Sequence, residues 1–170
     1  MTVIKEILLL GNPQLLKKSE PVNAGELPLA RSVGDDLKDT MMDFREKYAY
    51  GRAIAAPQIG VLKQIVYMQM DQPALLINPV ISDESEAMIE IWDDCMSFPD
   101  LLVRLRRHQS IRVNYRDENW DGQSIQAEDD LSELLQHEID HLHGVLATMR
   151  AIDGRAFALR SQRKFLMGDK

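Results

Sequence analysis

The sequence contains few of the features that characterise secreted, membrane-spanning or disulfide-bonded proteins. A single cysteine, Cys95, occurs among its 170 residues, so no intramolecular disulfide can form. The aliphatic run at residues 7–10 is far too short to cross a membrane, and no cleavage-site pattern follows it. We therefore expect a cytoplasmic protein that has no membrane as a partner.

Positive charge is also scarce. The chain has 20 lysine and arginine residues against 27 aspartate and glutamate residues, which gives a net charge of -7 and a pI near 5.1. Nucleic acid is not expected as the main partner, because phosphate contacts require a cationic surface. The length is that of one ordinary domain, so we predict a single domain over residues 1–170 that folds as a monomer.

The hydrophobic pattern changes along the chain from helical to strand-like and back. Apolar residues at three- and four-residue steps predict an amphipathic helix from residue 29 to about residue 50. Strands are predicted at residues 64–68, 74–77, 87–92 and 110–116. We expect Asn78 and Pro79 to halt the second of these strands. A second helix is predicted from Asp130 and a short surface helix at residues 155–164, an order typical of an α+β fold.

The second predicted helix carries a His-Glu-x-x-His motif. His137 and His141 lie four residues apart and share one helix face, so both imidazoles can bind the same metal ion. Glu138 follows the first histidine, where its carboxylate can reach a metal-bound water as a general base. The alternative is a chance match on a solvated helix, which residue frequencies make rare in a chain with 4 histidines.

Two histidines leave a catalytic metal ion short of a third protein ligand. The only acidic residues after His141 are Asp153 and Asp169, and His143 points away from the ligand face. Cys95 is the better candidate, although a lone cysteine is also typical of a buried structural thiol. A thiolate beside two imidazoles suits Fe²⁺, Zn²⁺, Ni²⁺ or Co²⁺.

A third segment, at residues 51–60, combines small residues with an uncharged amide. Small side chains allow a backbone to approach a ligand closely, and Gln58 offers a hydrogen-bond donor for a developing oxyanion. Taken alone, the segment is more typical of a turn that packs after a helix.

Together these three segments resemble the motifs of the peptide deformylases. That family carries Gly-x-Gly-x-Ala-Ala-x-Gln, then Glu-Gly-Cys-x-Ser, then His-Glu-x-Asp-His, and the third motif is matched fully here. The resemblance covers about residues 7–148. It implies an α+β fold in which small antiparallel or mixed sheets surround a central helix that carries the His-Glu-x-x-His motif. It also implies hydrolysis of the N-formyl group from formyl-methionyl peptides, or from another N-formylated amino compound, with release of formate.

The resemblance implies a role for each motif residue. One divalent metal ion, usually Fe²⁺ in the family, would be bound by Cys95, His137 and His141. Glu138 would act as the acid–base catalyst. The side-chain amide of Gln58 and the backbone N–H of Met96 would stabilise the oxyanion.

The first two motifs depart from the family pattern. Ala53 replaces a glycine, and Asp93 and Asp94 replace the Glu-Gly pair before the cysteine. Asp93 keeps the charge with a shorter reach. For Asp94 three consequences are open: a raised pKa of the thiol, weaker docking of the substrate, or a carboxylate that faces the solvent. Gly51, Ala53 and Asp94 are expected to contact the substrate.

Glu133 is the departure that bears on specificity. It lies four residues before His137, where the family usually has an aliphatic residue that lines the pocket for the methionine side chain. Just upstream, Asp129 and Asp130 replace a glycine and an apolar residue. A carboxylate in an apolar pocket is costly without a partner. Glu133 is therefore paired, or its pocket takes another side chain, or it is exposed on a shifted helix.

Two other functions compete with a deformylase. The first is a His-Glu-x-x-His metallopeptidase, which the missing downstream ligand and the segment that ends in Gln58 disfavour. The second is a metal-binding protein that has lost catalysis, which the departures Ala53, Asp94 and Glu133 favour.

Overall fold

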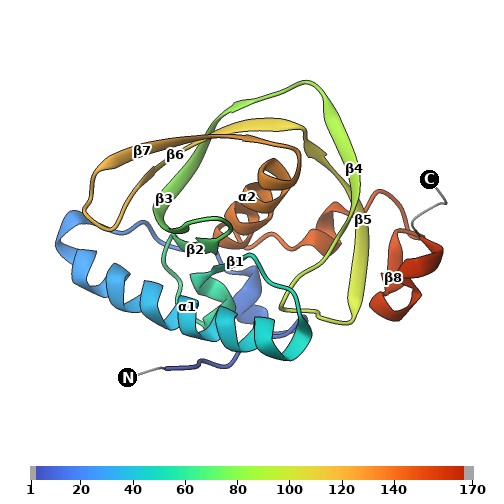
Figure 1. The fold of residues 1–170 in the computed structure, drawn as a ribbon, viewed down its shortest axis with the longest axis horizontal. Helices are drawn as coiled ribbons and strands as arrows, with labels where there is room; N and C mark the ends of the chain where they lie inside the picture. The colour runs from blue at the N-terminus through green and yellow to red at the C-terminus, as the bar shows by residue number, and fades with distance from the viewer. Residues whose placement is uncertain (1–2, 167–170) are drawn as a thin grey trace.

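The computed structural model describes residues 3–166, which form two antiparallel sheets and two long helices (Figure 1). The larger sheet has the strand order β1-β2-β3-β6-β7. Its strands are β1 (Ala53–Ala55), β2 (Ile65–Gln69), β3 (Pro73–Glu84), β6 (Ser110–Arg116) and β7 (Gly122–Glu128). The smaller sheet consists of β4 (Met88–Asp93), β5 (Leu101–His108) and β8 (Phe157–Leu159). The predicted α+β class is confirmed.

The two helices pack on opposite faces of the larger sheet. Helix α1 (Leu27–Tyr48) shares a buried cluster with Ile65 and Tyr67 of β2, whereas helix α2 (Asp129–Leu142) shares another cluster with Val66 and Met68. Successive strand residues point to opposite faces, so β2 contributes to both cores. In Figure 1, α1 runs along the lower edge of the molecule and α2 lies at its centre.

Helix α2 is far more buried than α1. Every residue from Ser132 to Leu142 is buried. Asp129 and Asp130 stand in its first turn, where carboxylates interact favourably with the helix dipole. The chain then turns at Gly144, whose φ of +71° places its Cα against the backbone of Leu16. A buried helix is a rigid support for the side chains of a functional site.

The expectation that Asn78 and Pro79 halt a strand is wrong. Strand β3 continues to Glu84 through a register shift between Ile77 and Val80. Asn78 adopts a φ of 51°, and its side-chain amide exchanges two hydrogen bonds of 2.8 Å with the backbone of Val22. The proline is therefore accommodated in a β-bulge.

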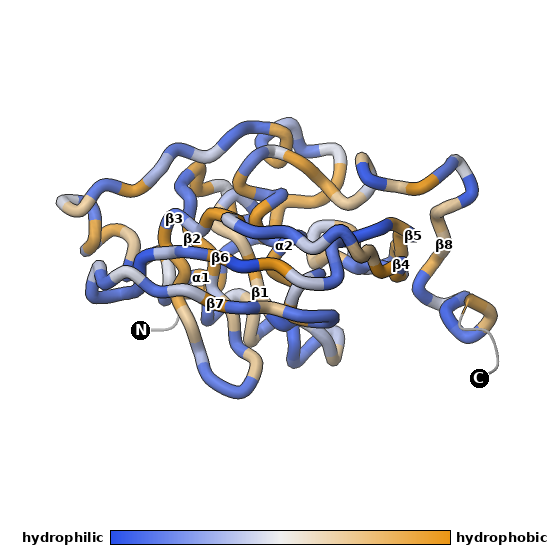
Figure 2. The backbone as a smooth tube through the Cα atoms, turned by 90° about the horizontal axis from the view of Figure 1, so that it is seen from above, coloured by the Kyte–Doolittle hydropathy of each residue, from blue (hydrophilic) through white to orange (hydrophobic). Residues whose placement is uncertain are grey.

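The predicted surface helix at residues 155–164 is replaced by two short elements. Phe157–Leu159 form β8, which pairs with β5, and Arg160–Phe165 form a 3-10 helix. Viewed from above, this segment lies at one end of the molecule, beside β4 and β5 (Figure 2). Further 3-10 helices are Pro13–Leu16, Ala24–Glu26, Ala56–Ile59 and Ala147–Arg150. Within residues 3–166, neither helix combines the length and the apolar composition that a membrane span requires.

Candidate active site

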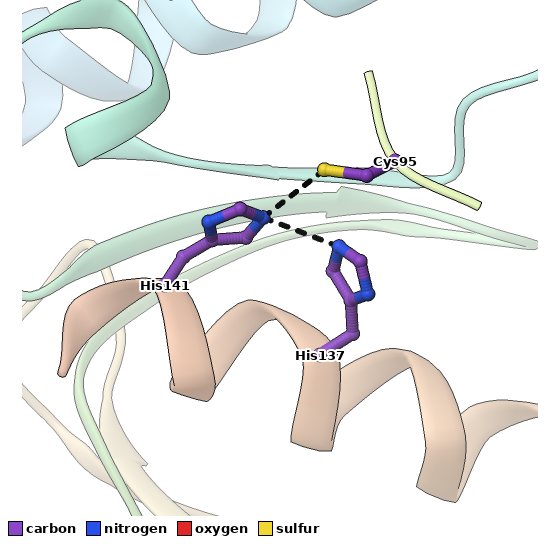
Figure 3. Close-up of side chains that lie close together, drawn as sticks. All are labelled: Cys95, His137 and His141. Carbon is purple, nitrogen blue, oxygen red and sulfur yellow. Dashed lines mark hydrogen bonds between the residues drawn. The ribbon is translucent and has the colours of Figure 1, made fainter. Parts of the chain in front are cut away.

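Helix α2 and the turn after β4 bring three metal-ligating side chains together. The ligand atoms of Cys95, His137 and His141 all lie within 4.8 Å of one another, and all three residues are buried. Nε2 of His141 lies 3.3 Å from Sγ of Cys95 and 3.2 Å from Nε2 of His137 (Figure 3). Cys95 lies 46 residues and His137 lies 4 residues before His141 in the sequence. The three predicted ligands nevertheless converge on one point.

The donor set fits a divalent transition-metal ion. One soft thiolate and two imidazoles are three protein ligands, the number that leaves a coordination position open in catalytic sites. No hydrogen-bond partner satisfies Oε2 of Glu138 in the described part of the chain, although this oxygen is buried. An orphaned buried oxygen beside three converging ligands indicates that a small polar species belongs there.

A buried carboxylate orients the first histidine. Nδ1 of His137 donates to Oδ2 of Asp93 over 3.0 Å, which leaves Nε2 free to act as a metal ligand. Burial raises the pKa of Asp93, but His137 and Arg107 outweigh this effect and hold it below its usual value. Nη2 of Arg107 donates to the same carboxylate oxygen over 3.2 Å.

Two arginines extend this network behind α2. Arg107 also donates to Asp140, the acidic residue of the third motif, and Arg150 donates to both oxygens of that carboxylate at 2.6 Å. Asp140 is therefore a buried carboxylate that is paired with two arginines. Neither Arg107 nor Arg150 was predicted as a site residue, because neither lies within a motif.

Glu138 is placed as an acid–base group. It is only 3% exposed, and burial raises its pKa to about 7. The neighbouring carboxylates of Asp93 and Glu133 raise the pKa further, while His137 lowers it. A carboxyl group with a pKa near neutrality can both accept and return a proton.

Gln58 lies against the thiol. Its Oε1 accepts a hydrogen bond of 2.9 Å from the backbone of Ala55, which directs Nε2 toward Sγ of Cys95 at 3.5 Å and Oγ of Ser97 at 3.2 Å. The backbone N–H of Ser97 also points at Sγ, over 3.4 Å. Ser97 was not among the predicted residues, although it follows Cys95 by only two positions.

The backbone N–H of Met96 is the other predicted oxyanion donor. It donates to no protein acceptor within residues 3–166. Met96 and Gln58 line the same cavity, which has a volume of about 900 Å³. Two donors in one cavity with the ligands provide the pattern that stabilises a developing oxyanion.

The residues predicted to contact a substrate all line this cavity. They are Gly51, Ala53, Asp94 and Glu133. Cys95, His137 and Glu138 line it as well, so two of the candidate ligands and the candidate base open onto the same space. Gly51 adopts a φ of +124°, a conformation that side chains other than hydrogen rarely permit.

Asp94 faces an arginine, so it is not free in the solvent. Its Oδ2 accepts a hydrogen bond of 2.9 Å from Nη2 of Arg160 and lies 4.0 Å from Nη1 of Arg163. The guanidinium of Arg160 stacks on the ring of Tyr50, 3.8 Å from its centroid. These contacts hold the segment after β8 at the rim of the cavity.

Glu133 is buried and paired. It is 7% exposed and forms an ion pair with Arg52, so the alternative of an exposed Glu133 on a shifted helix is wrong. Arg52 was not selected from the sequence, because it occupies a variable position of the first motif. The ion pair connects the first motif to α2, although its two residues lie 81 positions apart in the sequence.

Comparison with known proteins agrees with this site. The model of the family described as polypeptide deformylase matches residues 4–156. The chain belongs to the peptide deformylase family. A peptide deformylase from Parafrankia sp. (strain EAN1pec) is 39% identical over 145 residues, which are 84% of this chain and 76% of the relative. A second, from Rhizobium meliloti (strain 1021), is 36% identical over 149 residues, 84% of this chain and 82% of the relative.

Solved structures of the family share the fold. A peptide deformylase from Synechococcus elongatus in complex with actinonin superposes with a TM-score of 0.80 at 29% identity, covering 88% of this chain and 80% of that chain. A class I type b peptide deformylase from Acinetobacter baumannii with bound Met-Ala-Ser gives 0.81 at 25% identity, covering 88% and 99%. Membership makes this chain an enzyme of the hydrolase class, in a metal-dependent family, with a Cys-His-His cluster suited to a metal.

Proposed function

We propose that this chain is a metal-dependent amidohydrolase that removes the N-formyl group from the amino terminus of a peptide and releases formate. The observation that carries the proposal is the convergence of Cys95, His137 and His141 on one point. This point adjoins a cavity that Cys95, His137, Glu138 and Gln58 line. Two related structures support the proposal: one deformylase structure contains the peptide Met-Ala-Ser, and another contains actinonin.

The ion that we propose is Fe²⁺, with Zn²⁺, Ni²⁺ and Co²⁺ compatible with the same donors. The ligands are Cys95, His137 and His141. When bound, the ion supplies a Lewis acid that lowers the pKa of a water molecule and polarises the formyl carbonyl. Asp93 holds His137 in the tautomer that ligation requires.

Glu138 moves the protons of the reaction. Its carboxylate takes one proton from the attacking water, whose oxygen forms a bond to the formyl carbon. The carbon–nitrogen bond then breaks, and Glu138 delivers the proton to the departing amine. The products are formate and a free amino group, so no external oxidant or reductant is consumed.

Gln58 and Met96 hold the charge that develops on the formyl oxygen. The Gln58 amide is fixed by its bond to Ala55, and the N–H of Met96 has no competing protein acceptor within residues 3–166. Fixed donors of this kind stabilise the oxyanion without reorganising during the reaction. Removal of one such donor typically lowers kcat by about 10²–10³-fold.

The proposal includes action in the cytoplasm as a monomer, on peptides that carry an N-formyl group. It is tested by formate release from formyl-Met-Ala-Ser by the iron-, zinc-, nickel- and cobalt-loaded protein. Release of formate supports the proposal. Full metal occupancy without formate release from any N-formyl peptide supports a metal-binding protein that has lost catalysis. Cleavage of casein by the same preparations supports a metallopeptidase.

A further inference from the structure

Two oppositely charged residues from distant parts of the sequence meet in the wall of the cavity. Arg52 lies just before β1, and Glu133 lies on α2 one helical turn before His137. Nη2 of Arg52 donates to Oε1 of Glu133. Both residues line the same cavity as Cys95, His137 and Glu138. The pair is therefore within the reach of a substrate whose formyl group lies at the candidate metal ligands.

The pair is partly buried, so the charge on each residue is stabilised by the opposite charge on the other. The side chain of Glu133 is 9% exposed and that of Arg52 is 38% exposed. Burial raises the pKa of Glu133 and Arg52 opposes this effect, while Asp93 adds further negative potential. Removal of either partner would leave an uncompensated charge in the wall, which is costly.

The pair keeps unused hydrogen-bonding capacity. Oε2 of Glu133 has no hydrogen-bond partner among residues 3–166, and a guanidinium carries five N–H donors of which one is used on Glu133. Nη1 of Arg52 also lies 4.0 Å from Asp130, but the side chain of Asp130 is 91% exposed and screened by water. This part of the cavity wall thus offers a hydrogen-bond donor and a hydrogen-bond acceptor side by side, while the opposite charges of Arg52 and Glu133 neutralise each other.

We propose that this ion pair forms a side-chain subsite that selects an uncharged hydrogen-bonding side chain, a carboxamide such as that of glutamine, beside the formyl-bearing nitrogen. This inference rests on the proposed function. The carboxamide oxygen accepts from Arg52, and its NH₂ group donates to Glu133. An apolar substrate side chain would remove water from both charges without replacing the lost hydrogen bonds. A charged substrate side chain would pair with one of the two residues and leave the other as an unpaired buried charge.

The expected effect is a change in substrate rank. Sites that hydrogen-bond a substrate group discriminate against analogues that lack the group far more strongly than apolar pockets discriminate by size. We expect kcat/KM for formyl-Gln-Ala-Ser to exceed that for formyl-Met-Ala-Ser by about tenfold or more, with formyl-Lys-Ala-Ser and formyl-Glu-Ala-Ser below the glutamine peptide.

The test compares the parent protein with a double variant, Arg52→Ile/Glu133→Ile, which removes both charges together. Kinetics on the four formyl peptides are measured at equal metal content. Calorimetric affinities for Gln-Ala-Ser and Met-Ala-Ser supply a readout that does not require catalysis. The matched control is Glu26→Ile/Lys63→Ile, which removes a partly buried ion pair of 2.8 Å away from the cavity lining.

The parent protein and the control should both prefer the glutamine peptides, and the Arg52→Ile/Glu133→Ile protein should prefer the methionine peptides. The variant Arg52→Met/Glu133→Met, whose unbranched apolar side chains are closer in shape to the ones they replace, serves if the isoleucine variant does not fold. A parent preference for methionine or lysine, or an unchanged rank in a folded double variant, overturns the inference. Preferential binding of Gln-Ala-Ser without hydrolysis of any formyl peptide supports the subsite and overturns the proposed deformylation.

Discussion

Asp93 reaches Nδ1 of His137 over 3.0 Å, although its side chain is shorter than the glutamate of the family motif. The same carboxylate receives Arg107 from β5 over 3.2 Å. The same arginine also donates to Asp140 on α2, so the network connects β4, β5 and the helix that carries two of the candidate metal ligands. The orientation of one candidate ligand therefore depends on three elements that are separate in the sequence.

Asp93→Asn should weaken metal binding by about 10–100-fold, the usual effect of changing a partner of a metal-bound histidine. An amide is neutral, so His137 loses its negative neighbour even where Oδ1 of the asparagine accepts from Nδ1, and the imidazole becomes a weaker ligand. The measurement is a competition titration with a metal-sensitive chelating dye. Asp83→Asn, an exposed change on β3, is the control. Equal affinities in the two variants and the parent would show that Asp93 does not position the ligand.

Cys95→Ser should lower the metal content from close to one ion per chain to a small fraction. A hydroxyl is a much weaker ligand than a thiolate, and two imidazoles alone leave the ion short of donors. Elemental analysis of the purified variant measures the change. Full occupancy in this variant would identify Cys95 as a structural thiol.

Glu138→Ala should retain the metal and the fold but lose hydrolysis of N-formyl peptides by about 10²–10⁴-fold or more, since the general acid–base group is removed. Formate release at measured metal content tests this expectation. The control, Glu86→Ala, changes an exposed glutamate. A folded, metal-loaded Glu138→Ala protein with a rate within threefold of the parent would remove Glu138 from the mechanism.

Activity should fall as the pH falls through the pKa of Glu138. Burial raises this pKa to about 7, and the proposed base works only when it is ionised, so protonation removes the active form. A bound divalent cation favours the carboxylate, which places the acid limb of kcat/KM at or below pH 7. The profile is measured at constant metal occupancy. An increase in kcat/KM on acidification from pH 7 would contradict a carboxylate base.

Gly144→Ala should lower the free energy of unfolding by about 2 kcal/mol or more, a typical cost of a strained backbone position with a steric clash. Gly144 has a φ of +71°, and an added Cβ would lie 2.5 Å from the carbonyl oxygen of Leu16. Urea unfolding measures the loss. Gly154→Ala is the matched control, because its Cβ would meet nothing within 4 Å. Equal stabilities of the two variants would show that the turn after α2 tolerates a side chain.

Features with a short sequence period could be predicted from the sequence. The spacing of His137 and His141 places both on one helix face wherever that helix lies, so the motif needs no tertiary information. The helix at residues 29–50, strands β2, β4 and β6 and the first part of β3 followed from apolar periodicity, and the α+β class followed from their order. Strands β1, β5 and β7 were not predicted from the sequence. Strand β8 and the continuation of β3 through Pro79 did not follow from periodicity either, because pairing with β5 and the bulge at Asn78 determine them.

The partners of the charged residues were decided only by the tertiary structure. The sequence by itself determined that Glu133 needs a partner if it is buried, since an isolated carboxylate in an apolar wall is costly. It did not identify Arg52, which lies 81 residues away, or the pairing of Arg107 with Asp93. Electrostatic pairing depends on the distance between the charges in space and on their burial, and neither quantity produces a periodic pattern in the sequence. The two candidate histidine ligands were thus readable from local spacing, whereas the candidate specificity wall exists only once the first motif is folded against α2.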